Sequence, residues 1–135
     1  MIEYKLLPRP VTLEASIPLK SDAPDEVVSE YRNRFGGKLV VWKNAESMIC
    51  GCIHNNRSVV APLKELGNVC VYEMKPAKST GWVGMCLKTH SGEDVVTLFD
   101  SRHSDLSMKW LLATQEKVAS FLSLGSTFQD LGYDT

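Results

Sequence analysis

The chain has 135 residues, of which 44% are hydrophobic and 23% are charged, and its 15 basic and 16 acidic residues leave a net charge of -1. This composition is typical of a folded globular protein and excludes a disordered chain. The balanced charge offers no global attraction for nucleic acid, and no apolar run reaches the roughly 18 residues that a membrane span needs. The length predicts one domain over 1–135, with a core in 3–124 and a loosely attached tail at 125–135.

The first segment, MIEYKLLPRPVTLEASIPL, lacks the basic start and the continuous apolar stretch of a secretory signal. The four cysteines all lie in apolar, strand-like runs, where buried and reduced cysteines are found. They are Cys50, Cys52, Cys70 and Cys86. We therefore expect a reducing, cytoplasmic setting in which these thiols are buried and bind no metal.

Two short strands are predicted near the start of the chain, in EYKLLP and VTLEASIPL. In the second, apolar and polar residues alternate from Val11 to Ile17, which predicts one buried face. A helix is predicted over 22–35, because Ser21 or Asp22 can cap its start and the Gly36-Gly37 pair can end it.

From Lys38 onward the pattern becomes serial. Six strand-length segments follow one another: KLVVWKN, SMICGCIHN, SVVAPL, NVCVYEM, GWVGMCLKT and DVVTLFDS. They are rich in β-branched and aromatic residues, and turn residues separate them, including NNR at 55–57 and HSGED at 90–94. This order predicts an antiparallel meander.

A second helix is predicted in SDLSMKWLLATQEKVASFLSLG, from Ser104 or Asp105 to Gly125. Its apolar stripe comprises Met108, Leu111, Leu112, Val118, Ala119 and Leu122, with Trp110 and Phe121 beside it. A stripe of this width predicts that the helix packs on the sheet. The remaining STFQDLGYDT is short and polar, and this composition is the basis for the predicted loose tail.

A serial meander followed by one amphipathic helix, here from Lys38 to Leu124, resembles pleckstrin-homology-like domains. The segment MCLKTHSGEDVVTLFDSRHSDLSMKWLLATQEKVASFLSLG is similar to the last hairpin and helix of bacterial domains of this type. The resemblance implies an α+β fold: a bent antiparallel sheet or half-barrel meander, with one helix near the N-terminus and a long C-terminal helix packed on the sheet. The helix over 22–35 departs from the plain pattern. The alternative is a curved antiparallel sheet with both helices on one face.

A metal site is the first chemical possibility, because Cys50, Cys52 and His54 recur at every second position and share one face of a strand. They would spread over about 13 Å, too far for one ion to take all three ligands. Cys50 and Cys52 joined by a cysteine from another strand remain the alternative. Buried cysteines without metal or cofactor are the expected arrangement.

The segment DSRHSD at 100–105 combines residue types used by hydrolases. Adjacent residues at a strand end cannot point at one another as a catalytic triad requires, and a helix cap explains the hydroxyl and the acid. Arg102 and His103 remain candidate anion contacts near a helix N-terminus. Other basic residues in predicted turns could share a rim with them: Arg57, Lys75, Lys78, Lys88 and His90. With Trp82 as an interface anchor, the candidate binding residues are Arg57, Arg102, His103, His54 and Trp82. No catalytic residue is predicted.

The best interpretation is a non-catalytic binding module that engages a protein partner or a small ligand, with a homodimer formed through a sheet edge or through the tryptophan-bearing surface as the favoured case. The alternative is a small-molecule-binding protein or a small enzyme with a pocket between the sheet and the C-terminal helix. A filled interior with an exposed apolar patch would favour the module. A buried histidine or arginine facing an apolar cavity would favour the alternative.

Overall fold

A computed structural model describes residues 5–7, 15–18, 23–25, 29, 40–44, 49–54 and 57–134. Most of the helix predicted over 22–35 lies outside these residues. The side chains of four residues considered above also lie outside the description: Cys50, Cys52, His54 and Arg57.

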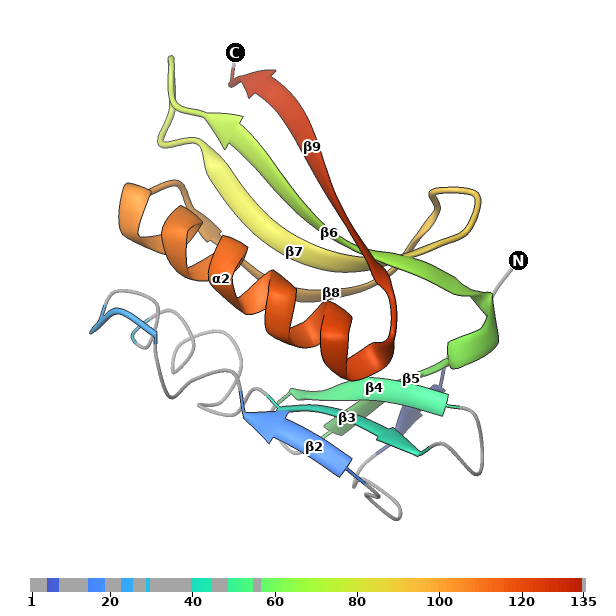
Figure 1. The fold of residues 1–135 in the computed structure, drawn as a ribbon. Coiled ribbons are helices and arrows are strands. Elements are labelled where there is room, and N and C mark those ends of the chain that lie inside the picture. Colours follow the sequence, from blue (N-terminus) through green and yellow to red (C-terminus); the bar gives the residue numbers. More distant parts are fainter. Residues whose placement is uncertain are drawn as a thin grey trace.

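The first half of the chain contributes a five-stranded sheet (Figure 1). Its strands are β1 (Lys5–Leu7), β2 (Ala15–Pro18), β3 (Val40–Asn44), β4 (Ile49–His54) and β5 (Arg57–Pro62). Their order across the sheet is β1-β5-β4-β3-β2, and every pairing is antiparallel. A single turn of 3-10 helix, η1 (Leu63–Glu65), then leads into the second sheet.

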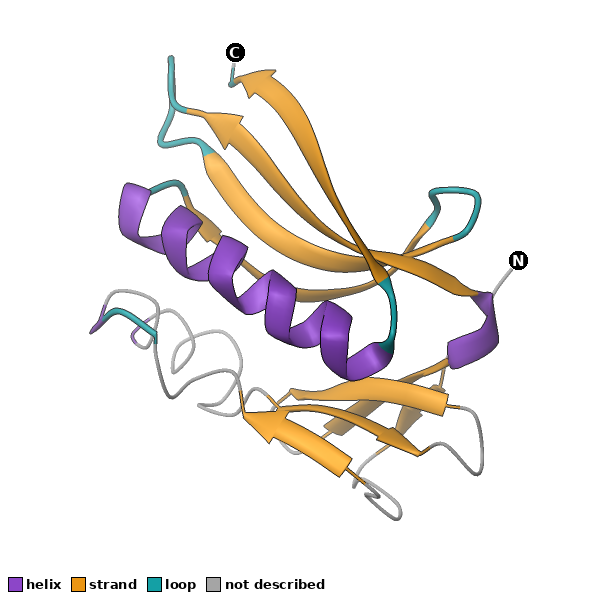
Figure 2. Ribbon diagram, in the orientation of Figure 1, coloured by secondary structure: helices purple, strands orange, loops and turns teal. Residues whose placement is uncertain are grey.

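The second sheet has four strands and carries the long helix. These elements are β6 (Leu66–Lys75), β7 (Trp82–Thr89), β8 (Asp94–Arg102), α2 (Asp105–Leu122) and β9 (Gly125–Tyr133). The strand order is β8-β7-β6-β9. β6, β7 and β8 pair antiparallel, whereas β9 runs parallel to β6, so the sheet is mixed. Figure 2 shows α2 lying across one face of this sheet.

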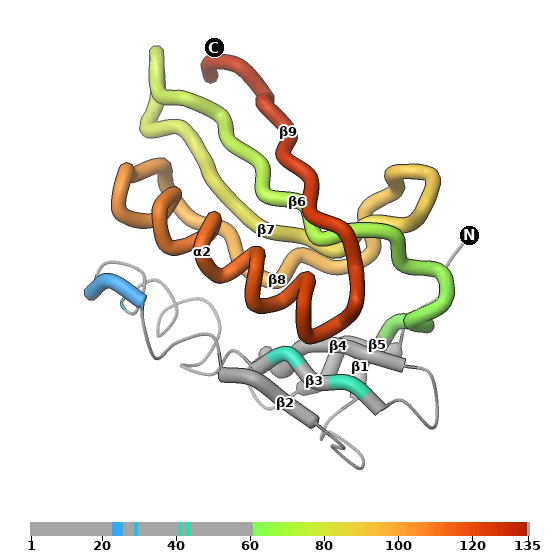
Figure 3. The backbone as a smooth tube through the Cα atoms, viewed as in Figure 1, coloured from blue at the N-terminus to red at the C-terminus, as the bar shows by residue number. Residues whose placement is uncertain are grey.

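The α+β class with mainly antiparallel pairing is confirmed, and β3 to β8 occur where the six serial strands were predicted. They do not form the predicted single meander, because η1 separates β5 from β6 and the two strands belong to different sheets. The prediction of a C-terminal helix is wrong, because β9 follows α2. Residues 125–133, predicted to be a loose tail, pair along β6, and the two strands run side by side in Figure 3. The error has a physical reason: β9 is held by backbone pairing, which its polar composition does not reveal.

The main core lies between α2 and the second sheet. Its largest members are entirely buried, among them Met85, Leu87, Phe99 and Leu111. Phe99 and Trp110 meet edge to face, with ring centroids 5.2 Å apart. Burial of this apolar surface is the main force that holds the helix on the sheet.

The first sheet joins the same core. Val41 of β3 and Ala61 of β5 belong to the cluster of buried residues that α2 and the second sheet form. Lys43 of β3 adds a polar link, because its Nζ donates a 2.7 Å hydrogen bond to the carbonyl of Phe121 and lies 4.7 Å from the centre of the Phe121 ring. The C-terminal part of α2 is thereby fixed to β3.

The start of α2 is as predicted, since the Ser104 hydroxyl accepts a 3.0 Å hydrogen bond from the Ser107 backbone N–H. The helix ends earlier than predicted, at a left-handed Ser123 with φ of 58°. Leu112, predicted to face the sheet, is 43% exposed. The buried face of α2 is rotated relative to the predicted apolar stripe, because this face includes polar residues, which a stripe of apolar residues leaves out. Its residues are Ser107, Trp110, Leu111, Thr114, Gln115, Val118, Ala119 and Leu122.

Candidate functional site

Three of the five candidate binding residues lie together at one end of the second sheet. Trp82, half-buried at the start of β7, pairs in register with the exposed Arg102 at the end of β8. His103 follows directly, and its backbone N–H points to the Gly81 carbonyl at 3.4 Å. The antiparallel β7–β8 pairing therefore brings together residues that are 20 positions apart in the chain.

The other two candidates belong to the first sheet. His54 and Arg57 are paired with each other in the β4–β5 hairpin. Among the other turn residues, Lys75 and Lys78 lie at the β6–β7 end with Arg102, whereas His90 lies at the β7–β8 turn. The basic residues thus do not form one common rim.

The His103 side chain is engaged by a carboxylate that the sequence analysis did not anticipate. Its Nε2 lies 2.7 Å from Oε2 of Glu73 on β6, and the two side chains are only 12% and 17% exposed. This pair fixes the orientation of the imidazole and ties the β8–α2 connection to β6. Its two residues are 30 positions apart, so no local motif in the sequence signals it.

The loop between β6 and β7 surrounds a second carboxylate. Oδ1 of Asp134 accepts hydrogen bonds from the backbone N–H groups of Ala77, Lys78 and Ser79 at 2.7, 2.8 and 3.1 Å, and Oδ2 accepts one from Gly81 at 2.8 Å. Desolvation opposes ionisation, but these hydrogen bonds outweigh it and lower the pKa of the Asp134 carboxyl. The loop is therefore arranged to hold an anion.

Two cysteines lie opposite each other in the middle of the sheet. Cys70 on β6 pairs in register with Cys86 on β7, and both are buried free thiols, as predicted for these two residues. Cys86 Sγ is 3.7 Å from Oδ1 of Asp94, which also forms a 3.1 Å ion pair with Lys88. Burial, followed by the Asp94 charge, raises the pKa of Cys86 to about 12. A thiol in this environment is a poor nucleophile.

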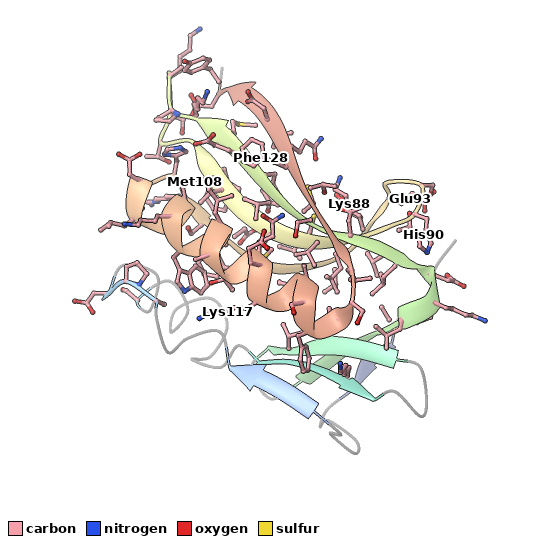
Figure 4. The ribbon with its side chains drawn as sticks, in the orientation of Figure 1. Lys88, His90, Glu93, Met108, Lys117 and Phe128 are labelled. Carbon is pink, nitrogen blue, oxygen red and sulfur yellow. The ribbon has the colours of Figure 1, made fainter. Side chains whose placement is uncertain are left out.

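The outer strand β9 presents the most exposed apolar side chains of the sheet. Phe128, Leu131 and Tyr133 are 50%, 40% and 63% exposed, and we call these three residues the β9 surface. Figure 4 shows Phe128 on β9 and Met108 on α2. The signal for this surface was present in FQDLGY, where aromatic and apolar residues interrupt a polar segment, but the sequence alone did not indicate a strand.

Gln115 connects α2 to both β6 and β9. Its buried amide Nε2 donates hydrogen bonds to the carbonyls of Val69 at 2.9 Å and Thr127 at 2.7 Å. A second side-chain link lies on the opposite face, where Thr127 Oγ1 donates to Oδ1 of Asn68 at 2.6 Å. These polar contacts, together with the backbone pairing, position β9 and therefore the β9 surface.

No family model matches the chain, and no curated protein or solved structure matches it either. Among the described residues, no cluster of three or more histidine, cysteine or acidic side chains could hold a metal ion. The part of the chain that the structure describes also contains no helix long and apolar enough to cross a membrane. The geometry of the surfaces described above is therefore the basis for a functional interpretation.

Proposed function

We propose that this protein is a non-catalytic binding module that associates with a second copy of itself through β9. One observation carries the proposal: β9 is a nine-residue strand at the edge of a sheet, and all of its residues are exposed except Gly132, which is half-buried. Phe128, Leu131 and Tyr133 are its exposed large apolar side chains.

An edge strand presents N–H and C=O groups to which another strand can pair, and natural proteins commonly protect such edges with lysine, proline or short strands. β9 contains neither lysine nor proline, and Asp130 is its only charged residue. Two β9 strands related by a two-fold axis can pair antiparallel and join their sheets. Such a pairing would remove Phe128 from water in both copies.

The packing of the interior supports a module over a pocket between the sheet and α2. Met85, Phe99 and Leu111 occupy this region and have no exposed surface. His103, one of the polar residues that could serve such a pocket, is engaged by Glu73. Exposed large apolar side chains lie outside this region, three of them on β9 and two, Leu106 and Leu112, on α2, and a protein partner can reach those on β9.

Light scattering over a concentration series tests the proposal. The wild-type chain should convert from monomer to dimer, and Phe128→Lys should weaken association by roughly tenfold or more, because it places a charge in the paired surface. Leu106→Lys is the matched control, since Leu106 is 58% exposed on the first turn of α2 and should leave the dissociation constant unchanged. A wild-type chain that stays monomeric up to about 1 mM, or equal weakening by both substitutions, would contradict the proposal.

A further inference from the structure

The loop that holds Asp134 has the geometry of an anion-binding backbone nest. Four N–H groups of residues 77–81 converge on one carboxylate that belongs to a different part of the chain. Successive N–H groups that point into one concavity bind oxyanions in phosphate-binding loops, where the backbone supplies most of the donors.

Gly81 makes this conformation available. Its φ is +73°, in the left-handed region, and a Cβ at this position would lie 2.5 Å from the Met74 carbonyl oxygen. Only glycine satisfies both constraints without strain. The Gly81 N–H consequently donates to Oδ2 of the same carboxylate whose Oδ1 accepts from residues 77–79.

The charge and accessibility of the loop also suit an anion from solvent. Residues 76–80 are exposed. Lys75 and Lys78 are the charged residues in this part of the chain, and no acidic residue occurs between Glu73 and Glu93. The negative charge that balances the loop therefore comes from Asp134, directly after β9.

We propose that the loop 77–81 is a binding site for the oxyanion of a phosphate group, and that the Asp134 carboxylate occupies it as an internal substitute. A phosphate carries more oxygens and more charge than a carboxylate, so it can use the same four N–H groups and attract Lys78 in addition. Binding displaces the Asp134 side chain and releases the end of β9. In the unbound protein, this end is also attached by a 2.9 Å hydrogen bond from the Asp134 backbone N–H to the Lys75 carbonyl. The site is built from residues 77–81 and Asp134 alone, so this proposal does not rest on the proposed dimer.

Titration with inorganic phosphate, followed by the backbone amide NMR signals of residues 77–81, tests the site. Asp134→Ala removes the internal competitor, so phosphate should bind this variant roughly tenfold more tightly than it binds the wild-type chain. Asp130→Ala is the matched control, because it removes the same charge from β9 but not from the loop. Asp130 Oδ1 accepts a hydrogen bond from Gly132 only two residues away. The Asp130→Ala variant should bind phosphate with the same affinity as the wild-type chain.

Three further measurements define the outcome. Acetate should bind Asp134→Ala more weakly than phosphate does, and a comparison of inorganic phosphate with O-phosphoserine shows whether a free ion or an esterified phosphate fits better. If Asp134→Ala does not fold, the wild-type chain in about 100 mM phosphate should still show shifts of the loop amides and of the amides at the end of β9, which Asp134 leaves. No such shifts in the wild-type chain, or equal phosphate affinities for the Asp134 and Asp130 variants, would overturn the proposal.

Discussion

Replacing Gln115 by leucine should loosen β9 while the rest of the core stays packed. Leucine is close to glutamine in size, so the buried position remains filled, but the amide that joins the Val69 and Thr127 carbonyls is lost. Gln115 is only 5% exposed, so water cannot readily replace its hydrogen bonds. The substitution therefore separates the polar link between α2 and β9 from the apolar packing beneath it.

The expected cost follows from these two hydrogen bonds. A buried hydrogen bond contributes about 0.5–1.5 kcal/mol net, and a carbonyl left buried without a donor costs about 1–3 kcal/mol. Thr127 is exposed, so its carbonyl can recover water, whereas Val69 is buried. We expect the free energy of unfolding to fall by about 1–3 kcal/mol, with the larger loss in the local stability of β9, because no β9 residue is buried.

Urea denaturation measures the global cost, and hydrogen exchange of the β9 amides measures the local one. Exchange in β9 should accelerate roughly 10- to 100-fold, since each 1.4 kcal/mol corresponds to about tenfold. Gln129→Leu is the control: Gln129 is an exposed β9 residue whose Oε1 accepts a 3.2 Å hydrogen bond from Lys88. It should change stability by less than about 0.5 kcal/mol. If the two variants have equal stability and equal β9 exchange, the assigned role of Gln115 is wrong.

Two further predictions concern the core and the buried thiol. Leu111→Ala should lower the free energy of unfolding by about 2–5 kcal/mol, because Leu111 is fully buried. Lys117→Ala, at an exposed position, should change the free energy of unfolding by less than about 0.5 kcal/mol. Equal small effects of the two substitutions in thermal melts would contradict the packing of α2. Iodoacetamide at about pH 8 should alkylate Cys86 roughly 1000-fold more slowly in the native than in the unfolded protein, because the pKa of the Cys86 thiol is raised from 9.0 to about 12. Fast labelling of native Cys86, detected by mass spectrometry, would refute the burial of this thiol. The stability that its neutral thiol contributes is present below pH 9.0 and is lost as the pH rises toward about 12.

Local signals in the sequence determined the elements with strong periodicity or clear end signals. The strand pattern from Lys38 onward, the Ser104 cap of α2 and the turn with a positive φ at Gly92 all depend on residues close together in the chain. The selection of Arg102 and His103 as candidate anion contacts followed from residue type and from their place before a helix. These inferences need no knowledge of which strands pair.

Only the tertiary structure decided the partners. The Glu73–His103 pair joins residues 30 positions apart, and the hydrogen bond from Ala77 to Asp134 spans 57 positions. The parallel pairing of β9 with β6 likewise depends on the path of the chain after α2, and it turned a polar segment into an edge strand. Hydrophobic periodicity reports which face of an element is buried, but it carries no information about the distant element that covers that face or about the backbone groups that will meet a carboxylate.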